Sequence, residues 1–131
     1  RRLSCDVSAG YDPLYASCVE KKNAADLGRG VCYNKYTGSR GKSGSNDASA
    51  ETMAKVISIM DEADVFWQIG ELGAVDEGGG GTVALYVAAM DMDVVDLGVP
   101  ILCMHSPFEL SSKLDVYYTY KAFAAFLESS K

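Results

Sequence analysis

The sequence has few of the residues on which small disulfide-rich or zinc-finger domains depend. Its 131 residues include one histidine, three prolines and four cysteines, and no two cysteines form a Cys-x-x-Cys pair. Without paired cysteines a zinc knuckle is excluded, and a disulfide framework would need a denser set of cysteines. We therefore expect reduced, mostly buried thiols in a cytoplasmic protein.

The sequence also lacks a basic excess and a long apolar run. Lys and Arg number 12 against 18 Asp and Glu, for a net charge of −6, which argues against nucleic-acid binding. No run approaches the ~18 apolar residues of a membrane span. With 48% hydrophobic residues the chain can build one packed core, so residues 1–131 are expected to form a single domain. The N-terminus has no apolar signal-peptide core and no initiator Met, so we expect a fragment of a longer protein.

Short apolar runs alternate with helical patterns along the chain. Ser49 is a candidate N-cap for a helix whose apolar residues recur at helical spacing, and further helices are expected at 82–90 and 111–129. The expected strands are 3–7, 31–36, 65–69 and one or two within 94–104. This alternation predicts an α/β fold, with a mostly parallel sheet flanked by helices on both faces. The apolar 65–69 run is typical of a central strand.

Ligand sites of such folds lie just after the strands, where four features stand out. They are Asp6, Lys35, the tetraglycine Gly78–Gly81 and the single histidine, His105. The Gly- and Ser-rich segment 36–47 lacks the glycine spacing of a phosphate loop, and its composition predicts a flexible loop.

Each feature also has a purely structural interpretation. His105 could be a hydrogen-bonded structural residue, and Asp6 a turn or cap residue. A carboxylate and an imidazole at two strand ends could instead share one metal ion, for which zinc is ordinary chemistry. The glycines could let a ligand approach the backbone, or simply form a mobile turn. The residues alone leave these alternatives open.

Several strings, taken in order, resemble the M18 aminopeptidases, and in particular their bacterial, aspartyl aminopeptidase-like branch. The resemblance covers nearly the whole chain. Its strings are Asp6-Val7-Ser8-Ala9, Lys35-Tyr36-Thr37-Gly38-Ser39-Arg40-Gly41-Lys42, Gly70-Glu71-Leu72-Gly73 with Gly78-Gly79-Gly80-Gly81-Thr82, Asp96-Leu97-Gly98-Val99-Pro100-Ile101-Leu102-Cys103-Met104-His105-Ser106-Pro107-Phe108-Glu109 and Lys113-Leu114-Asp115-Val116-Tyr117-Tyr118-Thr119-Tyr120-Lys121.

The resemblance implies a zinc peptidase catalytic domain, of which this chain is the C-terminal part. Such enzymes remove N-terminal residues from peptide substrates with two metal ions, usually zinc, and form large homo-oligomers, commonly dodecamers. By the resemblance, Asp6 and His105 are ligands to the same metal ion. Lys35 matches a substrate-contacting lysine, and Gly79, Gly80 and Gly81 match backbone that lines the substrate cleft.

Other parts of the family's machinery have no counterpart in this sequence. It contains no His-x-Asp motif and no adjacent pair of glutamates, which supply further ligands and the general base in the family. No catalytic residue is therefore expected within this chain, and the isolated 131 residues are expected to be inactive. The alternative is a non-catalytic α/β module that binds an anion or phosphate through Gly78–Gly81.

Overall fold

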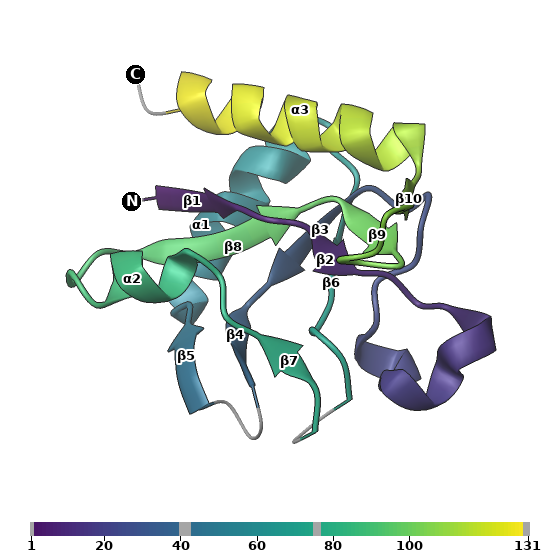
Figure 1. The fold of residues 1–131 in the computed structure, drawn as a ribbon. Coiled ribbons are helices and arrows are strands. Elements are labelled where there is room, and N and C mark those ends of the chain that lie inside the picture. The colour runs from purple at the N-terminus through teal and green to yellow at the C-terminus, as the bar shows by residue number, and fades with distance from the viewer. Residues whose placement is uncertain (1, 40–42, 75–76, 130–131) are drawn as a thin grey trace.

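The computed structural model describes residues 2–39, 43–74 and 77–129 (Figure 1). Its helices are α1 (Ala50–Glu62), α2 (Ala84–Ala88) and α3 (Lys113–Glu128), with 3-10 turns η1 (Pro13–Cys18) and η2 (Lys21–Asn23). Its strands are β1 (Arg2–Cys5), β2 (Ser8–Ala9), β3 (Val31–Asn34), β4 (Tyr36–Ser39), β5 (Ser43–Asp47), β6 (Trp67–Ile69), β7 (Gly79–Gly80), β8 (Val94–Gly98), β9 (Pro100–Leu102) and β10 (Leu110–Ser111).

The largest sheet has the strand order β1-β8-β3-β6. The β1–β8 and β3–β6 pairs are parallel, whereas β3 and β8 run antiparallel. The α/β class is confirmed, and the sheet is only partly parallel, because two of its three strand pairs are parallel and one is antiparallel. The reason lies between β1 and β3, where the described chain forms the short strand β2 and the turns η1 and η2 but no α-helix. Because no helical crossover joins β1 to β3, β3 is not required to run parallel to β1 and β8.

The hydrophobic core lies between one face of this sheet and the helices α1 and α3. Met53, Val56 and Met60 project from α1 onto β3 and β8, and Ala122 of α3 completes the cluster. Ser49 caps α1 by accepting a hydrogen bond from the Thr52 backbone N–H, as the sequence predicts.

Helix α3 is fixed to the sheet by a buried carboxylate. Asp115 lies in its first turn with no exposed surface, and accepts hydrogen bonds from the Gly28 and Gly30 backbone N–H groups at 2.7 and 2.8 Å. These glycines have φ values of +84° and +92°, which side chains adopt only with strain. The loop that leads into β3 is therefore shaped for this carboxylate.

Helix α2 contacts β1 and β8 on the opposite face of the sheet, so helices lie on both faces, and two small sheets adjoin the large one (Figure 1). One small sheet has the order β10-β9-β2 and the other the order β5-β4-β7. The prediction of a flexible loop at 36–47 is wrong for its described part, which pairs as the β4–β5 hairpin. Residues 40–42 of that segment and 75–76 of the glycine-rich segment lie outside the described residues.

Two further expectations need correction. The 65–69 run is an edge strand rather than a central one, with Phe66 and Ile69 about half exposed. All four cysteines are free, but only Cys32 is buried, so the prediction of mostly buried thiols is wrong. Apolar composition could not reveal either feature, because it does not specify which neighbour covers a residue. In the described residues, no helix is long and apolar enough to cross a membrane.

Candidate functional site

Asp6 lies just beyond the carboxyl end of β1, where β1 leads into β2. Its side chain is half-buried, and Oδ1 accepts a hydrogen bond from the Val7 backbone N–H at 2.8 Å. The Asp6 backbone passes directly over Gly98 at the end of β8. A Cβ atom on Gly98 would lie 1.3 Å from the Asp6 carbonyl oxygen, so only glycine allows this approach.

His105 lies in the turn between β9 and β10. Cys103 and His105 both have left-handed backbones, with φ values of 57° and 68°, and these reverse the chain. The His105 backbone N–H donates a hydrogen bond to Glu109 Oε1 at 2.6 Å, and the residue is exposed. Left-handed backbone at residues other than glycine costs free energy and is concentrated at functional sites.

Lys35 occupies the junction between β3 and β4. It forms an ion pair with Asp47 at the end of β5, and its side chain is 41% exposed. An exposed pair of this kind contributes little to stability, so the ammonium group can exchange partners at low cost.

The four glycines are constrained to different degrees. Gly78 has no room for a Cβ, because Ala74 N would lie 2.7 Å away, and Gly79 has a φ of +115°. The loop therefore contains a positive φ, which favours glycine over other residues. A Cβ atom on Gly80 would make only an ordinary contact, at 3.8 Å from Leu72 Cδ1, and a Cβ atom on Gly81 would have nothing within 4 Å. Packing within the described chain does not require glycine at these last two positions.

The structure brings some of these features together and leaves others apart. Pairing of β4 with β7 sets Gly80 beside Gly38, so the glycine loop adjoins the strand that follows Lys35. No hydrogen bond or ion pair joins Asp6 to His105 in the described chain. Within residues 2–39, 43–74 and 77–129, no three His, Cys, Asp or Glu side chains lie close enough to hold a metal ion. The helix α2, which follows the glycine loop, has only five residues, which gives little support to an anion site there.

Asp96 is a buried acid near Asp6 that the sequence reasoning missed. It has no exposed surface, and burial, with the nearby Asp6 charge, raises its pKa to about 6 even though Ser4, Asn34 and Thr82 lie close enough to favour the charged form. Neither of its oxygens forms a hydrogen bond of standard geometry. An aspartate inside the apolar run of β8 was the signal that could have found it.

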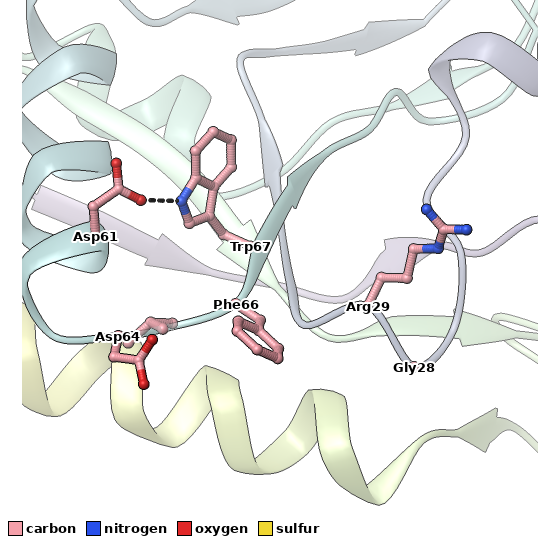
Figure 2. Close-up of a pocket in the computed structure, with 7 residues that line it drawn as sticks. Gly28, Arg29, Asp61, Asp64, Phe66 and Trp67 are labelled. Carbon is pink, nitrogen blue, oxygen red and sulfur yellow. Dashed lines mark hydrogen bonds between the residues drawn. The ribbon is translucent and has the colours of Figure 1, made fainter.

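A surface pocket of about 550 Å³ lies away from these residues (Figure 2). The Trp67 indole N–H donates to Asp61 Oδ1 at 2.7 Å on one side of it, and Arg29 lies on the other side. The lining residues are Gly28, Arg29, Asp61, Asp64, Val65, Phe66 and Trp67. None of the residues that the sequence singles out lines this pocket.

Comparison with known proteins decides the family. The family model described as "Aminopeptidase I zinc metalloprotease (M18)" matches residues 1–127. The chain belongs to the M18 family. The probable M18 family aminopeptidase 1 of Clostridium acetobutylicum is 53% identical over 127 residues, and that of Thermotoga maritima is 48% identical over 126 residues.

Solved M18 structures share the fold described above. The crystal structure of aminopeptidase I from C. acetobutylicum matches 95% of this chain with a TM-score of 0.91 at 54% identity. The T. maritima structure matches 94% with a TM-score of 0.90 at 48% identity. The resemblance to M18 and the α/β class are thereby confirmed.

The match covers only a part of each M18 relative. The match covers 97% of this chain but only 27% of the C. acetobutylicum protein. For the T. maritima protein it covers 96% of this chain and 28% of the relative. About three quarters of each relative therefore has no counterpart in these 131 residues. The family is one of zinc metalloproteases by description, and Asp6 and His105 offer a carboxylate and an imidazole, both ordinary zinc ligands. The donor chemistry fits zinc, whereas two ligands are fewer than a zinc centre needs.

Proposed function

We propose that this chain is part of the catalytic domain of a di-zinc aminopeptidase that removes N-terminal residues from peptides. The observation that carries the proposal is the M18 match over residues 1–127, at about half identity to aminopeptidases. Asp6 and His105 are proposed as metal ligands, and Lys35 with Gly79–Gly81 as the substrate-contacting part. The general base and the remaining ligands would come from parts of the protein outside this chain.

In this proposal the chain's own residues have distinct tasks. Zinc supplies the Lewis acidity that polarises a carbonyl and lowers the pKa of bound water. The Val7 N–H fixes one Asp6 oxygen at 2.8 Å and leaves the other free as a ligand. Lys35 can leave its exposed pair with Asp47 to contact substrate. The Gly80 and Gly81 backbone can be approached closely, because no Cβ stands in the way.

The proposal includes assembly and location. A homo-oligomer, with the dodecamer as the expected form, is supported by the shared fold, at 24% identity and a TM-score of 0.67, with a solved structure described as a dodecamer, PhTET1-12s. A cytoplasmic location is supported by the four free cysteines.

A chimera tests the proposed activity. This chain would replace the matching segment of the C. acetobutylicum relative, to which it is 53% identical. We expect the zinc-loaded chimera to hydrolyse amino-acid anilides and the His105→Ala chimera to lose this activity while still folding. Replacing Lys35 with Ala should raise KM, lower kcat or change both. A folded, zinc-loaded chimera without hydrolysis, or one in which His105→Ala changes nothing, would contradict the proposal.

A further inference from the structure

Three buried polar residues form a row across neighbouring strands, on the sheet face opposite the hydrophobic core. Ser4 pairs with Asp96 across β1 and β8, and Asn34 pairs with Asp96 across β3 and β8. Directly paired residues place their side chains on the same face of a sheet, within reach of one another. Ser4 is 7% exposed, and Asp96 and Asn34 are fully buried.

The row is polar where the other face is apolar. On β8 the alternate residues Val95 and Leu97 belong to the hydrophobic core. The Ser4 hydroxyl, the Asn34 Nδ2 group and both Asp96 oxygens form no hydrogen bond of standard geometry. Burial of a carboxylate costs several kcal/mol relative to an apolar side chain. Departures from ordinary core chemistry of this kind are expected where a site, rather than stability, determines the residue.

Each neighbour of Asp96 belongs to a segment that carries a candidate site residue. Ser4 lies on β1, two residues before Asp6, and Asn34 lies on β3, directly before Lys35. Thr82, whose hydroxyl also lies near Asp96, directly follows the glycine loop. Asp96 therefore lies where three separate segments of the candidate site meet.

A second contact ties Asp6 to the same strand. Gly98, two residues after Asp96, lies against the Asp6 carbonyl oxygen so closely that no side chain fits. The Asp6 backbone is thus held at the end of β8, while its carboxylate lies close enough to Asp96 for their charges to interact.

We propose that Asp96 is a positioning residue, whose buried carboxylate holds Asp6, Lys35 and the glycine loop in their relative places. The inference rests on the proposed function, because Asp6 is a proposed zinc ligand. Asp96 itself would touch neither zinc nor substrate. It would act through Ser4, Asn34 and Thr82, in the way that residues behind a metal ligand orient that ligand.

The test is a zinc titration of the chimera described above, in which the relative's segments supply the ligands that this chain lacks, together with backbone amide NMR of the metal-free 131-residue chain. Asp96→Asn keeps the side-chain size and removes the charge. We expect it to weaken zinc binding roughly 10- to 100-fold, the range typical of residues that orient a ligand. The Val7 amide signal of the metal-free chain should also shift, because that N–H donates to Asp6 Oδ1. Thr37→Val is the matched control, since Thr37 is 2% exposed, has an unpartnered hydroxyl and lies outside the row, so zinc affinity should stay unchanged.

Asp6→Ala separates this inference from the proposed function. Loss of zinc binding in Asp6→Ala, with unchanged affinity in Asp96→Asn, would overturn the positioning role and leave the proposed function intact. Unchanged affinity in Asp6→Ala would overturn the proposed function itself. If Asp96→Asn fails to fold, Ser4→Ala removes a neighbour of the carboxylate and keeps the charge. Zinc affinity and Val7 amide signal both unchanged in Ser4→Ala would then overturn the inference.

Discussion

Replacement of Asp115 with Ala should destabilise the chain more than any other single loss of a carboxylate that the structure shows. The Asp115 carboxylate is fully buried and accepts two backbone N–H groups at 2.7 and 2.8 Å. Hydrogen bonds to a charged group contribute about 1.5–3 kcal/mol each. Gly28 is exposed, so water can replace one bond, but Gly30 is buried and its N–H would stay unpaired. We therefore expect the free energy of unfolding to fall by about 3 kcal/mol.

Thermal and urea unfolding of the 131-residue chain measure this loss. For a domain of this size, about 3 kcal/mol corresponds to a decrease in Tm of roughly 10 °C. Asp61→Ala is the matched control, because its carboxylate also accepts one hydrogen bond, from Trp67, but is exposed. That variant should lose less than about 1 kcal/mol. Equal losses in Asp115→Ala and Asp61→Ala would refute the argument that burial sets the cost.

Three further predictions follow from burial and backbone geometry. Gly98→Ala should lower Tm strongly, because its Cβ would lie 1.3 Å from the Asp6 carbonyl oxygen, whereas Gly81→Ala, with nothing within 4 Å, should change the free energy of unfolding by less than about 1 kcal/mol. The raised pKa of Asp96, about 6, means that the folded chain keeps this proton longer than the unfolded chain, so stability falls as pH rises from about 4 to 6. Asp96→Asn should remove up to roughly 3 kcal/mol of that fall in metal-free urea titrations, and an unchanged pH slope would contradict the assignment. Burial raises the pKa of Cys32 to about 11, so iodoacetamide should label the other three cysteines first. Mass spectrometry of the folded chain measures the labelling rates, and an equally fast reaction of Cys32 would contradict the prediction.

The elements with strong periodicity could be predicted from sequence, and those set by distant neighbours could not. The apolar spacing and Ser49 cap of α1 are local, so the helix begins where the sequence predicts. The direction of β3 depends on a connection without an α-helix, which alternation of strands and helices does not reveal. The composition of the β4–β5 hairpin is that of a loop, so the sequence does not predict its strands. Backbone pairing between the two strands, rather than side-chain type, holds the hairpin together.

The candidate site divides in the same way. Asp6, Lys35 and His105 stand after strands, a position that the sequence pattern shows directly. Asp96 was missed because its importance comes from its pairing with Ser4 and Asn34, which lie more than 60 residues earlier in the chain. The pairing register of strands places residues side by side that lie too far apart in the sequence for any short stretch of it to reveal their contact.

The most direct test of the central claim is the position of zinc in a crystal of the chimera described above. Anomalous diffraction at the zinc edge should place zinc about 2.0–2.2 Å from an Asp6 carboxylate oxygen and about 2.0–2.1 Å from a His105 ring nitrogen. Zinc bound in the chimera with neither Asp6 nor His105 among its ligands would contradict the account.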